Sequence, residues 1–150
     1  MAEKIKVKGN RMQDMWHALG KHIILEVFTD DKELLDNENA IVNIIKEACE
    51  YANVELLNIA THKFSPHGVT AVALLAESHL SIHTWPEYGY AAVDIYTCGG
   101  WPEKAMEKMI EKLGAYFYDM KMYLRGEYSM VESIINNRAE EKDAFKGNTD

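Results

Sequence analysis

Residues 77–99 read ESHLSIHTWPEYGYAAVDIYTCG. Apolar and β-branched residues alternate with polar ones on both sides of a Trp-Pro-Glu-Tyr-Gly segment at 85–89. This composition is typical of a strand, a turn and a second strand. The same stretch holds two histidines, one cysteine and a serine that follows a glutamate. A hairpin needs no such density of reactive side chains, so the stretch is also the first candidate for function.

Outward from this hairpin, the pattern predicts six strands and two helices. The strands are expected at 20–29, 54–64, 69–76, 79–85, 90–97 and 115–130. Residues 39–51 place apolar side chains at i, i+3, i+4, i+7 and i+8, which predicts a helix capped by Asp36 or Asn37. A second helix is expected to open at Pro102 and to end at Gly114.

The order β-α-β-β-β-β-α-β predicts an α+β fold: an antiparallel sheet with both helices on one face, in two layers. The other sheet face then needs a cover, and a second copy of the chain would supply it. We therefore expect a homodimer that packs sheet to sheet, as αββα. Residues 1–150 are expected to form a single domain, with 1–17 as an N-terminal extension of uncertain order. The charged tail at 132–150 is expected to be frayed or to hold a short helix.

Composition and charge exclude several classes of protein. The net charge of −8 argues against a nucleic-acid binder, which needs a basic face. No apolar run approaches the roughly 20 residues of a membrane span. The charged N-terminus has no apolar core after it, so no signal peptide is expected. Two cysteines, Cys49 and Cys98, give no disulfide framework, and we expect a cytoplasmic protein.

The residues alone leave three chemistries open for the central stretch. His79 and His83 are four apart, about 13 Å on a strand, which is too far for one shared metal, so no metal site is expected. Gly-x-Ser-x-Gly is absent around Ser78, which disfavours a serine hydrolase. The third possibility is that the Ser78 hydroxyl attacks the preceding carbonyl, cuts the chain and leaves a pyruvoyl group that forms a Schiff base with an amine.

The central stretch resembles the signature of prokaryotic S-adenosylmethionine decarboxylase proenzymes. Residues 62–70, HKFSPHGVT, are similar to the segment that precedes it in that family, and residues 34–37, LLDN, to an earlier loop. The resemblance covers roughly residues 18–100. It implies a self-cleaving, pyruvoyl-dependent enzyme that converts S-adenosylmethionine to its decarboxylated form plus carbon dioxide. The product is the aminopropyl donor for spermidine biosynthesis.

The resemblance also implies roles for residues that process the chain. Cleavage is expected between Glu77 and Ser78, to give chains 1–77 and 78–150. Ser78 would become the covalent pyruvoyl cofactor. His83 and the hydroxyl of Thr70 would assist processing; the family often has serine at the latter position.

Three further roles concern the substrate. By the same resemblance, Cys98 would protonate the substrate α-carbon after carbon dioxide leaves. Phe64 would stack on adenine, and Glu87 would hold the ribose hydroxyls. His22, His62, His67 and His79 receive no role.

Pairing of 69–76 with 79–85 in a tight hairpin would place Thr70 roughly opposite His83 on one face. We expect Glu87 to join these two residues, and Ser78 and Cys98 to form a second group. Two facing copies would then build two composite active sites per dimer.

Two rival functions remain. Related pyruvoyl-dependent proenzymes decarboxylate arginine or ornithine, but Phe64 and Glu87 together favour a nucleoside substrate. An unprocessed homologue would be a non-catalytic binding or regulatory subunit.

Overall fold

The computed structural model describes residues 3–147, and its centre is a six-stranded antiparallel sheet with the order β2-β3-β4-β5-β1-β6. In sheet order, the strands are β2 (Leu56–Lys63), β3 (Val69–Leu75), β4 (Ser78–Trp85), β5 (Tyr90–Thr97), β1 (Ala18–Thr29) and β6 (Ala115–Glu127). The predicted α+β class and the antiparallel sheet are confirmed.

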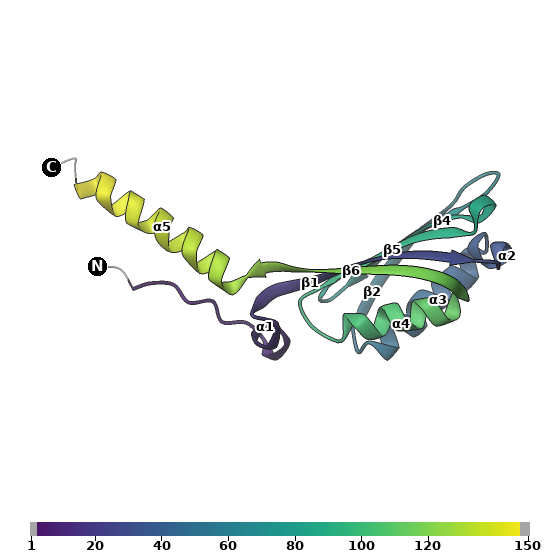
Figure 1. The fold of residues 1–150 in the computed structure, drawn as a ribbon, viewed down its shortest axis with the longest axis horizontal. Helices are drawn as coiled ribbons and strands as arrows, with labels where there is room; N and C mark the ends of the chain where they lie inside the picture. The colour runs from purple at the N-terminus through teal and green to yellow at the C-terminus, as the bar shows by residue number, and fades with distance from the viewer. Residues whose placement is uncertain (1–2, 148–150) are drawn as a thin grey trace.

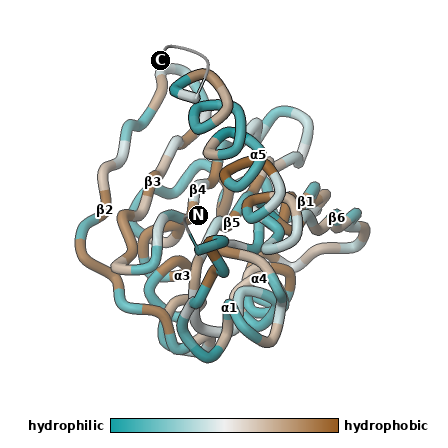
Figure 2. The backbone as a smooth tube through the Cα atoms, turned by 90° about the vertical axis from the view of Figure 1, so that its left-hand side faces the viewer, coloured by the Kyte–Doolittle hydropathy of each residue, from teal (hydrophilic) through white to brown (hydrophobic). Residues whose placement is uncertain are grey.

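Helices α3 (Glu38–Tyr51) and α4 (Pro102–Lys112) cover one face of the sheet, as predicted (Figure 1). Viewed along the strands, both helices lie on the same side (Figure 2). The core lies between these layers and includes Ile23, Ile45, Ile82 and Met106, all fully buried. Asn37 caps α3 by accepting a hydrogen bond from the backbone N–H of Ala40 at 3.0 Å.

The β3–β4 hairpin places Thr70 opposite His83, close to the expected arrangement. Only residues 76 and 77 lie between the strands, because Leu75 pairs with Ser78, and Thr70 consequently pairs with His83. Alternate side chains of β4 point into the core, so His79, Ser81 and His83 lie on the opposite face. That opposite face, which α3 and α4 do not cover, is called the open face below.

The chain ends contain more helix than the sequence pattern predicts. Strand β6 ends at Glu127, and α5 (Tyr128–Gly147) then runs as one long helix through the charged tail. Lys, Glu, Ala and Arg favour helix even without an apolar stripe, which explains the difference. The outer ends of the predicted arm and tail, residues 1–2 and 148–150, lie outside the described residues.

Three short helical turns were also not predicted: α1 (Arg11–Trp16), α2 (Lys32–Leu35) and the 3₁₀ turn η1 (Pro86–Tyr88). Helix α1 has a capping box, in which the Asn10 side chain accepts from Gln13 N–H at 2.8 Å while the Gln13 side chain accepts from Asn10 N–H at 2.7 Å. The predicted N-terminal arm is therefore partly helical.

The two ends of the described chain extend from the same end of the sheet (Figure 1). The backbone N–H of Ile5 donates to the side-chain oxygen of Asn136 at 2.8 Å, and that of Val7 donates to the Glu132 carboxylate at 2.8 Å. The N-terminal segment is thereby held against α5. Within residues 3–147, no helix combines the length and the apolar content needed to span a bilayer.

Candidate active site

Thr70 and His83 form a hydrogen-bonded pair on the open face. The Thr70 hydroxyl lies 3.0 Å from Nδ1 of His83, and the two residues are directly opposite each other in β3 and β4. A shallow hollow runs from His83 across the face past Ser81 and Asp94 to His22. The structure therefore brings together the two residues expected to assist processing.

Phe64 and Glu87 lie in the connections at the same end of the sheet. Phe64 follows β2, is 46% exposed, and packs edge-on against His62 with ring centroids 4.5 Å apart. Its backbone N–H donates to the Gly68 carbonyl at 2.8 Å, which closes the loop that leads into β3. Glu87 is exposed in η1. Among the described residues, no hydrogen bond joins Glu87 to His83, so the expected cluster of Thr70, His83 and Glu87 is not closed by one.

Glu77, Ser78 and Cys98 lie at the other end of β4. The backbone N–H of Cys98 donates to the Glu77 carbonyl oxygen at 3.1 Å. That carbonyl belongs to the peptide bond between Glu77 and Ser78. Ser78 has φ 153°, a backbone conformation that residues with a β-carbon rarely adopt and that stores strain. A strained peptide with a donor on its carbonyl oxygen is arranged for attack at the carbonyl carbon.

The two groups are separated along one strand. Ser78 begins β4 and His83 follows five residues later in the same unbroken strand. Five residues of extended chain span about 17 Å. Within one chain, the Thr70–His83 pair therefore does not contact the Glu77–Ser78 peptide.

The second cysteine lies in the core. Cys49 is 2% exposed in the core, where burial, with a smaller contribution from the Glu77 charge, raises the pKa of its thiol to about 11. Cys98 is half-buried beside Glu77. The prediction that Cys49 belongs to the core is confirmed.

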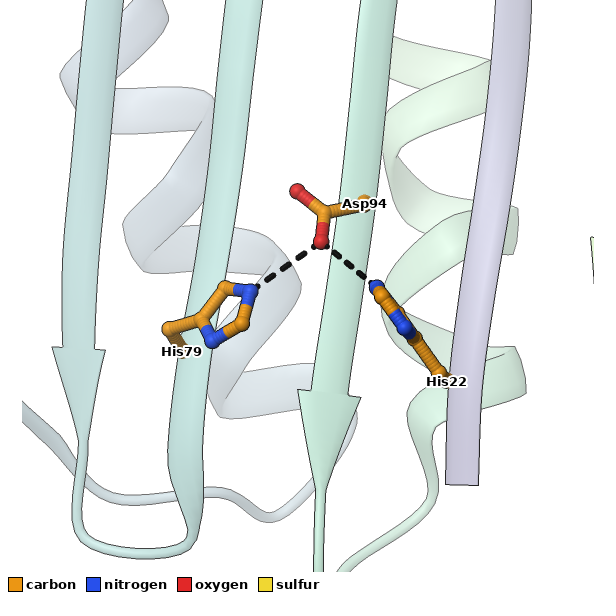
Figure 3. Close-up of side chains that lie close together, drawn as sticks. All are labelled: His22, His79 and Asp94. Atoms are coloured by element: carbon orange, nitrogen blue, oxygen red, sulfur yellow. Dashed lines mark hydrogen bonds and ion pairs between the residues drawn. The ribbon is translucent and has the colours of Figure 1, made fainter. Parts of the chain in front are cut away.

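Three side chains with no predicted role meet on the open face (Figure 3). Nε2 of His22 lies 2.8 Å and Nε2 of His79 lies 3.0 Å from the same carboxylate oxygen, Oδ2 of Asp94. The Ser81 hydroxyl donates to the other oxygen of Asp94. Nδ1 of His79 in turn lies 3.5 Å from the Ser78 hydroxyl oxygen. This group, His22–His79–Asp94, is called the histidine–aspartate cluster below.

The surroundings of Asp94 keep it ionised. Burial alone would raise the pKa of this carboxyl, but hydrogen bonds from Ser81, His22 and His79 together outweigh burial and hold the pKa below its ordinary value. An ionised carboxylate accepts hydrogen bonds and donates none. Both histidines therefore present N–H groups to Asp94.

Arg125 of β6 completes the surroundings of the cluster. Its guanidinium donates to Nδ1 of His22 at 3.2 Å and lies over the Tyr96 ring, 5.6 Å from the centroid. The three potential ligand atoms of His22, His79 and Asp94 lie within 4.8 Å of one another, a spacing that a cation also requires. The fixed positive charge of Arg125 opposes a cation there, and hydrogen bonds already satisfy the carboxylate.

Sequence reasoning missed this cluster because its members come from three strands. The available signal was the alternation in β1 and β5, where His22 and Asp94 occupy half-buried positions between buried neighbours. The alternation places each residue on the open face, but only the register brings them together.

Comparisons with known proteins identify the family. The family model for S-adenosylmethionine decarboxylase matches residues 21–126. The chain is 50% identical over 118 residues to an S-adenosylmethionine decarboxylase proenzyme of Synechococcus sp., covering 77% of this chain and 92% of that protein. It is 49% identical over 116 residues to one of Methanococcus aeolicus, covering 76% and 97%.

A solved structure has the same fold. The adenosylmethionine decarboxylase of Aquifex aeolicus is 40% identical, with a TM-score of 0.69 over 73% of this chain and 92% of that one. These matches confirm the resemblance seen in residues 77–99. The chain therefore belongs to the S-adenosylmethionine decarboxylase family.

Proposed function

We propose that the chain cuts itself between Glu77 and Ser78 and then decarboxylates S-adenosylmethionine, to supply the aminopropyl donor for spermidine biosynthesis. The observation that carries this proposal is the hydrogen bond from Cys98 N–H to the Glu77 carbonyl, beside the strained backbone of Ser78. Attack by the Ser78 hydroxyl would convert this amide to an ester. Elimination would then release chain 1–77, and hydrolysis would leave a pyruvoyl group on chain 78–150.

The residues around Ser78 fit a pyruvoyl group made in place. The group, once formed, supplies an electron sink for loss of carbon dioxide from an α-amino acid. Cys98 is beside the carbonyl of the scissile peptide, where its thiol would deliver a proton to the substrate α-carbon. Thr70 and His83 are proposed to assist processing through their hydrogen-bonded pair.

S-adenosylmethionine is the substrate that the family and the pocket residues support. The exposed ring of Phe64 is available to stack on adenine, and the exposed carboxylate of Glu87 is available to accept from the ribose hydroxyls. Arginine and ornithine have neither a purine ring nor a ribose diol, so they would not use Phe64 and Glu87 together in this way. The family match favours S-adenosylmethionine over these two substrates, and favours an enzyme over the non-catalytic alternative.

We further propose a homodimer with composite active sites. Ser78 and His83 lie about 17 Å apart along β4, so one chain does not supply both groups to one site. The open face carries exposed apolar side chains as well as the polar ones, including Val72, Leu74, Phe117 and Tyr123. A second copy that faces this sheet would cover them and would bring its own His83 to the Ser78 of its partner.

A cytoplasmic location is also part of the proposal. Cys49 and Cys98 are both free thiols, and a reducing compartment keeps them so.

Intact-protein mass and carbon dioxide release test the proposed function. The purified chain is expected to appear as fragments 1–77 and 78–150, the second blocked at its N-terminus. Ser78→Ala is expected to remain whole, whereas the control Ser133→Ala, on exposed α5, is expected to cut normally. Carbon dioxide is expected from S-adenosylmethionine and not from arginine or ornithine. An uncut wild-type chain, or a Ser78→Ala chain cut after Glu77, would reject the proposal.

A further inference from the structure

A continuous hydrogen-bonded path runs from the Ser78 hydroxyl through His79 to Asp94. The Ser78 oxygen lies 3.5 Å from Nδ1 of His79, and Nε2 of the same ring lies 3.0 Å from the Asp94 carboxylate. The order of groups is that of a serine, a base and a carboxylate that orients the base. The hydroxyl in question is the one that the proposed self-cleavage requires as nucleophile.

The hydrogen-bond partners of His79 decide which of its ring nitrogens can accept a proton. Asp94 is an acceptor, so Nε2 of His79 carries the hydrogen and donates it. The neutral ring then has its lone pair on Nδ1, which is the nitrogen that faces Ser78. The carboxylate thus selects the tautomer of His79 that accepts a proton from the serine.

The hydrogen-bond partners of His22 fix its tautomer in the same way. Arg125 has only donors, so Nδ1 of His22 accepts and its Nε2–H points to Asp94. Asp94 therefore receives donors from His22, His79 and Ser81, and it stays in place as an anion. The groups that face His79 from neighbouring elements are Asp94 and Tyr96 of β5 and His22 of β1, with Arg125 behind them.

We propose that His79 is the general base that removes the proton from the Ser78 hydroxyl during self-cleavage, and that Asp94 positions it. This inference rests on the proposed function. It assigns a catalytic role to His79, which touches the reacting hydroxyl, and a positioning role to Asp94, which acts through His79.

The step balances without any further reactant. The Ser78 oxygen forms a bond to the Glu77 carbonyl carbon while its proton passes to Nδ1 of His79. The carbonyl electron pair moves to the Glu77 oxygen, toward the N–H of Cys98 at 3.1 Å. When the pair returns, the carbon–nitrogen bond breaks and His79 gives its proton to the departing nitrogen. An amide has become an ester, and His79 is neutral again.

His83 is the competing base. In its own chain it lies five residues along β4, outside reach of the Ser78 hydroxyl. Only the His83 of a second copy would compete with His79 for this proton. The experiment must therefore separate ester formation from the later elimination, for which either histidine would serve.

The test follows the cleavage of freshly made precursor in three variants. His79→Ala removes the base, and His79→Gln retains a donor for Asp94 but cannot take up a proton. Asp94→Asn presents an amide donor to Nε2 of His79. The ring hydrogen would then lie on Nδ1, which could no longer accept the proton of Ser78. Each is expected to slow cleavage by about 100-fold or more, the range for a general base. His67→Ala, an exposed histidine in the 64–68 loop, is the control and should cleave normally.

Two readouts separate a chemical role from a structural one. Free imidazole should partly restore cleavage in His79→Ala. Neutral hydroxylamine cuts esters but leaves amides intact, so it should release no 1–77 fragment from the uncut variants. Melting temperatures establish that each variant is folded. If His79→Ala does not fold, His79→Gln is used for the hydroxylamine test in its place.

The outcomes are distinct. Release of 1–77 by hydroxylamine from folded His79→Ala or His79→Gln would show that the ester forms without His79, and would overturn the inference. Wild-type cleavage rates in these variants, or no rescue by imidazole in a folded His79→Ala chain, would do the same. A wild-type chain that never cleaves would instead reject the proposed function on which the inference rests.

Discussion

The side-chain amide of Asn10 donates a hydrogen bond to the carbonyl oxygen of Cys98 at 2.8 Å. The oxygen of the same amide accepts from the N–H of Gln13 and caps α1. One side chain thus joins the N-terminal segment to the turn that carries the proposed proton donor. Asn10 precedes the residues that match the family model, which begin at Lys21. The segment before the shared domain is therefore in contact with the candidate site.

Replacing Asn10 separates its two contacts. Serine is as good an N-cap as asparagine but is too short to reach Cys98, whereas alanine loses both contacts. We expect Asn10→Ser and Asn10→Ala to cleave themselves but to lose severalfold in turnover, because the Cys98 turn is less well fixed. Only Asn10→Ala should also lose about 1 kcal/mol of stability. Steady-state kinetics and thermal unfolding measure the two effects, and full activity in Asn10→Ser would show that the amide does not position Cys98.

Cys98→Ala is expected to cleave itself but to decarboxylate slowly. The backbone N–H that donates to Glu77 survives this substitution, so the proposed processing step retains its donor. Loss of a general acid costs about 10²- to 10⁴-fold in rate. A proton that reaches the cofactor instead of the substrate leaves alanine, so the variant should inactivate in fewer turnovers. Mass spectrometry of chain 78–150 should find alanine at its N-terminus.

Cys49→Ala is the matched control for the thiol. Its sulfur is in the core, so the change should lower stability and leave the turnover number unchanged. Wild-type turnover and lifetime in Cys98→Ala would show that another group delivers the proton.

The Thr70 hydroxyl is tested by two substitutions of similar size. Thr70→Ser keeps the group that lies 3.0 Å from His83, whereas Thr70→Val keeps the shape and removes it. We expect Thr70→Ser to process and turn over within a factor of about three of wild type, and Thr70→Val to slow processing by about tenfold or more. Equal rates in the two variants would assign Thr70 to packing alone.

Mixed dimers test the composite site. Ser78→Ala and His83→Ala are each expected to be inactive alone. When they are refolded together in equal amounts, about half of the dimers are mixed, and each mixed dimer has one intact site. We therefore expect about one quarter of wild-type carbon dioxide release. No recovery in dimers shown to be mixed would place each site within one chain.

Acid should weaken the contribution of Asp94 to stability. Its pKa is lowered in the folded chain, so the carboxylate stabilises the fold above the unfolded value of about 3.9 and loses that effect as pH falls through the folded value. We expect Asp94→Asn to be less stable than wild type by about 1–3 kcal/mol at neutral pH, and the difference to shrink below pH of about 4. A difference that stays constant between pH 5 and pH 3 would contradict this assignment.

Local patterns predicted most of the sheet and both packed helices. A tight hairpin put Thr70 roughly opposite His83, and the observed turn at residues 76 and 77 makes the two residues direct partners. Asn37 and Gly114 marked helix ends for reasons that lie within a few residues. These features needed no knowledge of distant parts of the chain.

The histidine–aspartate cluster depended on what local patterns do not contain. The sequence pattern relates His79 only to His83, four residues along the same strand. The partners of His79 in the structure come from β5 and β1. Asp94 pairs with Ile24 of β1, two residues from His22, and it does so only because β1 lies beside β5 in the sheet. The strand order is a property of the whole fold, and no alternation of polar and apolar residues reveals it.

The strand order also decides what a cut at Glu77 would leave behind. Chain 1–77 would supply β1, β2 and β3, and chain 78–150 would supply β4, β5 and β6, yet β1 lies between β5 and β6. The two products would be interleaved rather than adjacent, so neither could leave without dismantling the sheet. Once denatured and separated, they would have to find each other again. Folding of each protomer would change from a unimolecular process to a bimolecular one. Recovery of the folded protomer would therefore depend on concentration for the mature protein but not for the uncut chain.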